Sequence, residues 1–386
     1  MTPDRRTLLA LFALAFGLRV LYAVVFGDDP NVVAHDSYGY RIAARMVESW
    51  EWITTPFSPT APGYRMLLAL AFKLFGVSWW TAVMLNAVLG AITTLFLYRI
   101  GERLLGKRVG LIAALWLGLS VNHWYFASLA ARDVLVTFLV TWLAYALARP
   151  FYRMRTATWI AFLCALLFHT EPMFLVLLPL LIVFLAVGST HHRVLSAQYV
   201  FLFMAALFVF FLPWTIRNFV VYRDVVPVAL EAQRYTAPVA RILRDAPPEP
   251  AATTHPEATV IRRPGFFANE REFWRVARFA ASPGDPARGV RPEPAWSLRH
   301  NAAGILNYGV LLPFFVAGSI FAVKRRHRAA LVLLSTVLGY AVLRGFIGAS
   351  DYSRLYVEPL IILVALYGVK ELLEKRRTAG EATPTA

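Results

Sequence analysis

Long apolar runs alternate with short basic clusters along most of this 386-residue chain. A helix needs about 20 apolar residues to cross the hydrocarbon core of a bilayer, and fewer where protein or water shields one end. The pattern therefore predicts ten membrane-spanning helices, at 7–26, 79–98, 109–121, 132–148, 157–168, 171–187, 198–214, 303–323, 329–343 and 355–370. A further apolar stretch, 63–76, is too short to cross alone, so it predicts a re-entrant or interfacial helix.

Two polar segments between the predicted spans are too long to be simple connections. The first, 27–63, contains a helical pattern that runs from Ser37 to Trp50. The second, 217–302, contains ten prolines between Pro238 and Pro294 and an amphipathic pattern over 265–281, whose aromatic residues suit the membrane–water boundary. A proline-stiffened loop with one surface helix explains the second segment equally well.

The basic clusters predict the orientation of the chain. With the N-terminus in the cytoplasm, the short inner segments, such as 99–108 and 324–328, hold many basic residues, and the short outer segments hold few. Both termini are then cytoplasmic, and the two long segments lie on the extracytoplasmic face. The predicted organisation is a catalytic core over 1–216, an outer loop over 217–302, and C-terminal helices with a cytoplasmic tail over 303–386.

Composition supports an all-α polytopic membrane protein. Hydrophobic residues make up 58% of the chain and charged residues 16%, where a soluble domain carries roughly 25% charged residues. The net charge of +16 is spread between apolar runs, which favours membrane topology over a nucleic-acid partner. The single Cys164 excludes an intramolecular disulfide and a cysteine zinc site. No small-residue cleavage site follows the first apolar run, so we expect a retained span.

Four different short motifs lie at or near the predicted outer ends of the spans. They are His35-Asp36-Ser37-Tyr38-Gly39-Tyr40, Pro62-Gly63-Tyr64-Arg65, Leu212-Pro213-Trp214-Thr215-Ile216-Arg217-Asn218, and Tyr352-Ser353-Arg354 with Glu358-Pro359. In this order and placement they resemble the GT-C glycosyltransferases, and most closely the branch of protein O-mannosyltransferases and aminoarabinose transferases. The resemblance covers most of residues 1–220 and the final span.

The resemblance implies a bacterial inner-membrane enzyme with its active site on the extracytoplasmic face. Such an enzyme moves a sugar from a polyprenyl-phosphate donor to an acceptor hydroxyl on a lipid, glycan or protein, with inversion by direct displacement. An alcohol is a poor nucleophile, so a carboxylate is needed to take its proton, and the resemblance gives that role to Asp36. Alternatively, Asp36 or Ser37 only caps the following helix. His35 and Tyr40 are expected to assist substrate binding.

Two further carboxylates lie at predicted outer ends. Asp133 follows Arg132 at the start of the fourth span and is the second candidate catalytic residue, although the two residues also suit a local cap. Glu171 precedes Pro172 at the turn between spans five and six, where related sequences often carry a basic residue. Because this chain has an acid there, a phosphate role is not expected; acceptor binding, cation binding and a helix cap all fit.

A fixed guanidinium is expected to stabilise the departing phosphate. Arg217 is the first candidate, Arg354 the second and Arg65 the third, and the alternative for each is an arginine that snorkels to lipid headgroups. The histidines lack metal-ligand spacing, so no cofactor is predicted and a divalent cation has no support. There is also no nucleotide-binding glycine-rich loop, which favours a lipid-linked donor over a nucleotide sugar.

Two other functions remain open from the sequence. A transporter or flippase for lipid-linked saccharides would place its charges near the membrane midplane, often in repeated halves. Here the charged residues gather at the predicted outer rim and no repeat is visible, which favours the enzyme. A non-catalytic subunit with the same fold is the second alternative, because His35-Asp36 replaces the more usual pair of acids. Membrane lipids and the polyprenyl-phosphate sugar are the predicted partners.

Overall fold

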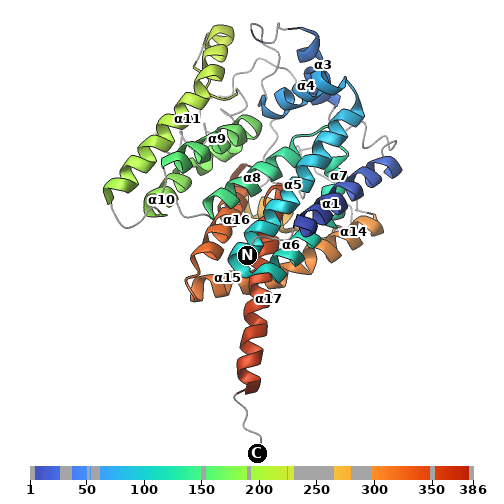
Figure 1. Cartoon of the computed structure of the whole chain (residues 1–386), viewed down its shortest axis with the longest axis vertical. Coiled ribbons are helices and arrows are strands. Elements are labelled where there is room, and N and C mark those ends of the chain that lie inside the picture. The colour runs from blue at the N-terminus through green and yellow to red at the C-terminus, as the bar shows by residue number, and fades with distance from the viewer. Residues whose placement is uncertain are drawn as a thin grey trace, which may run out of the picture. The chain divides into compact units, whose positions relative to one another are not determined.

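The structure is a computed structural model. It describes residues 5–26, 37–49, 53, 61–148, 154–188, 193–223, 225–229, 265–279, 297–347 and 353–381. Within these ranges all regular structure is helical (Figure 1). The candidate residues His35 and Asp36 lie outside the described residues.

A helix occupies each of the ten segments predicted to span the membrane. The helices are α1 (Arg5–Phe26), α5 (Trp79–Leu105), α6 (Lys107–Gly118) with α7 (Val121–Ala127), α8 (Asp133–Leu147), α9 (Met154–Thr170), η2 (Pro172–Leu177) with α10 (Leu178–Gly188), α11 (Arg193–Tyr222), α14 (Leu298–Gly304) with η4 (Ile305–Gly309) and α15 (Leu311–Lys324), α16 (Arg328–Ile347), and α17 (Glu358–Glu381), which η5 (Ser353–Tyr356) precedes.

Five of the described helical segments are long and apolar enough to cross a membrane. They are Arg5–Phe26, Trp79–Leu105, Ala197–Tyr222, Asn301–Lys324 and Ala329–Phe346. The pair α6 and α7, bent by 54°, makes a sixth if it is one broken span. The chain is therefore an integral membrane protein, and the total of ten spans stays a prediction.

The polar segments also contain helices. The first forms α3 (Ser37–Glu48), and the short apolar stretch after it forms α4 (Gly63–Phe75). In the second, α13 covers Phe266–Trp274, so the helix predicted over 265–281 is too long. The helix ends there because the Arg354 guanidinium donates hydrogen bonds to the carbonyl oxygens of Phe273 and Arg275. In a continuing helix, the Phe273 carbonyl would instead accept a hydrogen bond from a backbone N–H one turn later.

Two compact units make up the chain. The first unit is Met1–Thr236 with Leu355–Leu363, and the second is Ala237–Arg354 with Val364–Ala386. The organisation predicted from membrane topology, with boundaries after 216 and 302, stays a prediction. The start of α17 belongs to the first unit, which contains most of the candidate residues.

In the first unit, α5 is the central helix, and it packs against α1, α6 and α8 (Figure 1). The α5–α6 contact is close because both helices have glycine at the crossing: a methyl group on Gly110 would lie 2.7 Å from the Tyr98 carbonyl oxygen. The turn between them uses Gly106, whose φ of +104° favours glycine. Small residues thus set the spacing of these apolar helices.

The start of α4 lies directly on the end of α9. A Cβ on Gly63 would lie 2.9 Å from the His169 carbonyl oxygen and would also overlap Thr170 Oγ1. The next residue, Tyr64, donates its hydroxyl to Asn86 Oδ1 of α5 at 3.3 Å. The Pro-Gly-Tyr motif therefore anchors α4 to two neighbouring helices.

We expect Gly63→Ala to destabilise the protein by about 1–3 kcal/mol, because the new methyl group meets backbone atoms that cannot move alone. Thermal unfolding of the purified protein measures the loss. Gly17→Ala is the matched control, since no atom lies within 4 Å of a Cβ at that exposed position of α1. Equal unfolding temperatures for the Gly63 variant and the wild type would contradict the close contact.

Candidate functional site

The start of α8 and the start of α17 meet in the first unit. Asp133 is the first residue of α8, and its Oδ1 accepts a hydrogen bond from the Tyr356 hydroxyl at 3.0 Å. One turn later, Thr137 Oγ1 donates to the Leu355 carbonyl oxygen at 3.4 Å. These contacts fix the segment before α17 against the end of α8 that carries the candidate carboxylate.

Arg132 and Glu171 form an ion pair beside this contact. Arg132 Nε lies 3.3 Å from Glu171 Oε2, and the Glu171 side chain is 4% exposed while that of Arg132 is 33% exposed. Phe174, in the turn that begins at Glu171, places its ring 6.4 Å from that of Tyr356. Two carboxylates, a guanidinium and a phenol from three separate segments therefore lie together.

Both acidic residues have contacts beyond their own helix. The Glu171 side chain makes no capping hydrogen bond to η2, and the Arg132 side chain makes none to α8. Arg132 pairs with Glu171, and Asp133 accepts a hydrogen bond from Tyr356, so both residues have a partner from elsewhere in the chain. Burying a carboxylate as deeply as that of Glu171 costs hydration free energy, and a nearby cation and hydrogen bonds compensate this cost.

A second carboxylate of the same unit contacts a histidine. His123 Nε2 of α7 is 3.6 Å from Glu358 Oε2 at the start of α17, and both side chains are buried. No role was predicted from the sequence for either residue. A signal was present, because each is an ionisable residue within or beside an apolar run, but nothing in the sequence indicated that they meet.

Arg217 is held near the end of α11. It is 8% exposed, its Nη1 donates to Asn218 Oδ1 at 3.0 Å, and its Cζ lies 5.0 Å from the Trp214 ring centroid and 5.6 Å from that of Tyr222. This burial against protein rings differs from an arginine that snorkels to headgroups. The Trp214 ring also lies 6.4 Å from that of His169, so Arg217 and the turn at Glu171 belong to the same end of the unit.

Asn218 positions both Arg217 and the chain that follows α11. Its Nδ2 donates to the carbonyl oxygens of Val226 at 2.8 Å and Val228 at 3.2 Å, while its Oδ1 accepts from Arg217. A buried amide with its donors and acceptor engaged holds a defined orientation. Asn218 belongs to the motif over 212–218, but no role was predicted for it from the sequence.

Two further candidates belong to helices α3 and α4, and α4 begins against the end of α9 beside Glu171. Tyr40 packs its ring edge against Phe72 at 5.0 Å, and burial raises the pKa of the Tyr40 hydroxyl, which keeps it protonated as a donor. Arg65 donates from Nη1 to the Ala61 carbonyl oxygen at 3.4 Å. Both residues belong to the helix pair α3 and α4.

Arg354 belongs to the second unit. Its Nη1 donates to the carbonyl oxygens of Phe273 at 3.0 Å and Arg275 at 2.8 Å, and its Cζ lies 3.6 Å from the Tyr308 ring centroid. These contacts fix the end of α13. Within the described ranges, no three histidine, cysteine or acidic side chains are grouped so that they could hold a metal ion.

Part of the sequence matches a family model, and the fold is similar to that of solved glycosyltransferases. Residues 59–216 match the family model described as dolichyl-phosphate-mannose-protein mannosyltransferase. The Archaeoglobus fulgidus oligosaccharyltransferase in its apo form superposes with a TM-score of 0.59 and 13% identity. ArnT from Cupriavidus metallidurans bound to undecaprenyl phosphate gives a TM-score of 0.55 and 15% identity. Each match covers 98% of this chain, and both enzymes are GT-C members. The chain has the GT-C fold.

This finding confirms the resemblance seen in the sequence motifs. A third structure with the GT-C fold, archaeal AglB from Archaeoglobus fulgidus in complex with an inhibitory peptide and a dolichol-phosphate, matches with a TM-score of 0.57 and 11% identity over 98% of this chain. The chain spans 52% of both oligosaccharyltransferase structures and 62% of ArnT. Comparison with curated protein sequences gives no match. The family match runs from the segment before α4 into α11 and includes Arg65, Asp133 and Glu171.

Proposed function

We propose that this protein is a GT-C glycosyltransferase that moves a sugar from a polyprenyl-phosphate donor to an acceptor hydroxyl on the extracytoplasmic face of a bacterial inner membrane. The observation that carries the proposal is the group of Arg132, Asp133, Glu171 and Tyr356 at one end of the first unit. The same fold can carry many functions, so the function is inferred from the residues of the site. Sugar transfer needs carboxylates for the acceptor and a cation for the phosphate, and both kinds of group are present.

The class of donor is supported by two of the similar structures. ArnT is bound to undecaprenyl phosphate, and archaeal AglB is in complex with a dolichol-phosphate. Both ligands are phosphates on a long apolar carrier, which stays in the bilayer while its headgroup reaches a site at the membrane edge. A chain with several apolar helices around polar helix ends suits such a donor.

The proposed reaction is a direct displacement. The acceptor hydroxyl attacks the anomeric carbon and forms the new carbon–oxygen bond, while Asp36 takes the hydroxyl proton. The bond between the anomeric carbon and the phosphate oxygen breaks, and its electron pair leaves with the polyprenyl phosphate. Attack from the face opposite the leaving group inverts the anomeric centre. Asp133, fixed by Tyr356, orients the acceptor, and Arg217 stabilises the charge that grows on the phosphate.

Reconstitution in proteoliposomes tests the proposal. Purified protein is incubated with polyprenyl-phosphate sugars that carry a radiolabel on the sugar, together with an extract of envelope lipids and glycans. We expect loss of donor, release of polyprenyl phosphate and a labelled acceptor. A donor that crosses the bilayer unchanged would instead identify a flippase, and a protein that neither binds nor consumes any donor would identify a non-catalytic subunit.

Tyr356→Phe is expected to lower turnover about tenfold, with little change in KM for the donor, because the phenylalanine ring keeps the contact with Phe174 while Asp133 loses its hydrogen bond. Steady-state kinetics measures turnover and KM for the donor separately. Tyr98→Phe is the matched control, since the Tyr98 hydroxyl donates to Glu102 Oε1 at 3.2 Å near the far end of α5. Equal losses in both variants would show that the effect is not specific to Asp133.

A further inference from the structure

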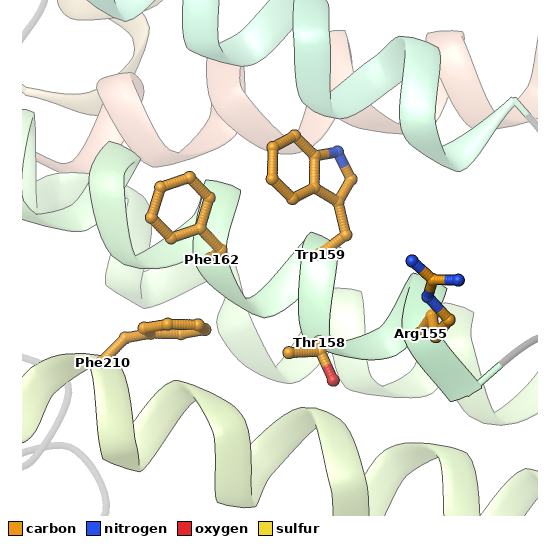
Figure 2. Close-up of a pocket in the computed structure, with 5 residues that line it drawn as sticks. All are labelled: Arg155, Thr158, Trp159, Phe162 and Phe210. Carbon is orange, nitrogen blue, oxygen red and sulfur yellow. The ribbon is translucent and has the colours of Figure 1, made fainter.

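A groove lined by aromatic residues lies between α9 and α11 (Figure 2). It has a volume of about 550 Å³ and is lined by Arg155, Thr158, Trp159 and Phe162 of α9 and by Phe210 of α11. The Trp159 and Phe162 rings are stacked 5.3 Å apart, and Phe162 meets Phe210 edge-on at 5.4 Å. Arg155 is the one charged residue of this lining.

The groove lies on a surface that faces lipid in a membrane protein. Trp159 is 43% exposed, and the neighbouring helix α11 exposes Phe201 by 75% and Phe208 by 65%. Apolar side chains this exposed are stable in hydrocarbon and costly in water. A ligand of the groove therefore reaches it from the bilayer and has an apolar part.

The charged end of the groove is remote from the proposed site. Arg155 is the second residue of α9, and Glu171 follows its last residue, Thr170. At 1.5 Å per residue, Arg155 and Thr170 are about 22 Å apart along the helix, which is most of the hydrocarbon thickness. A donor whose phosphate lies at the proposed site cannot place the same phosphate at Arg155.

We propose that this groove binds an anionic phospholipid of the leaflet opposite the proposed site. Arg155 contacts the lipid phosphate, and one acyl chain lies along Thr158, Trp159, Phe162 and Phe210. Charge complementarity supports this occupant, because a guanidinium at a membrane surface attracts anionic headgroups. The planar rings form an apolar wall against which the acyl chain of the lipid packs. The inference rests on the predicted crossing of the membrane by α9 and is independent of the proposed sugar transfer.

Native mass spectrometry of the delipidated full-length protein tests the groove. The protein is titrated with phosphatidylglycerol and, separately, with phosphatidylcholine that has the same acyl chains. We expect tighter binding of phosphatidylglycerol and a loss of about fivefold in its affinity for Arg155→Gln, with phosphatidylcholine unchanged. Arg108→Gln is the matched control, because Arg108 is likewise the exposed second residue of a helix, α6, and does not line the groove.

A second variant tests the apolar part without changing the charge. Thr158→Trp places an indole in the groove, so it should weaken both lipids while Arg155 is retained. If that variant does not fold, Phe210→Ala removes one wall and should also weaken both. Unchanged phosphatidylglycerol binding in the Arg155 and groove variants would overturn the proposal, as would an equal loss in Arg108→Gln. Displacement of phosphatidylglycerol by undecaprenyl phosphate, but not by inorganic phosphate, would assign the groove to the carrier instead.

Discussion

Asp36→Asn is expected to lower sugar transfer by about 100-fold to 10,000-fold, the range that a positioned general base contributes. Asparagine keeps an oxygen that can cap α3, which begins at Ser37, but it cannot take the acceptor proton. The thermal unfolding temperature should therefore stay close to that of the wild type. Turnover of a polyprenyl-phosphate sugar by purified protein, measured beside thermal unfolding, separates the two roles.

Ser37→Ala is the matched control for this prediction. It removes the other candidate cap, the hydroxyl at the adjacent position, and leaves the carboxylate in place, so activity should be retained even if stability falls. If Asp36→Asn keeps more than about a tenth of the activity, which corresponds to a barrier change of roughly 1.4 kcal/mol, then Asp36 is a helix cap and the base lies elsewhere. Asp133 would then be the first residue to test.

The arrangement of apolar runs was sufficient to locate the helices. Each predicted span contains a helix because a run of apolar side chains in lipid has to satisfy its backbone groups internally. The number of crossings could not be obtained in the same way. Helix α8 has 15 residues, and α6 with α7 is bent by 54°, so their length and apolarity leave several placements relative to the bilayer open.

Candidate residues were easier to predict than their partners. Asp133 and Glu171 were visible as acids at the ends of apolar runs, and for each of them a local helix cap fitted the sequence as well as a role in the site. Their contacts instead come from distant segments, and the hydrogen bond from Tyr356 to Asp133 joins residues 223 positions apart. Local spacing carries no information about such a pair. Arg354 illustrates the same limit, because only the fold shows that its guanidinium binds the carbonyls at the end of α13.

Substitutions of Arg217 distinguish a phosphate ligand from a structural arginine. If it stabilises the departing phosphate, Arg217→Lys and Arg217→Ala should both lower turnover by on the order of 100-fold, the size seen when one oxyanion-type donor is removed. A lysine lacks the planar fork that binds a phosphate through two nitrogen atoms. Donor affinity should fall less than turnover, because this contact strengthens mainly in the transition state.

Asn218→Leu is the control that isolates the structural contribution. It removes the bonds to Val226 and Val228 and the contact with Arg217, but it leaves the guanidinium charge. A purely structural Arg217 predicts that this variant and Arg217→Lys lose turnover and thermal stability together. A phosphate ligand predicts that Arg217→Lys loses far more turnover than Asn218→Leu at a similar unfolding temperature. A fully active lysine variant would move the phosphate role to Arg65, because Arg354 already holds the end of α13 through two backbone carbonyls.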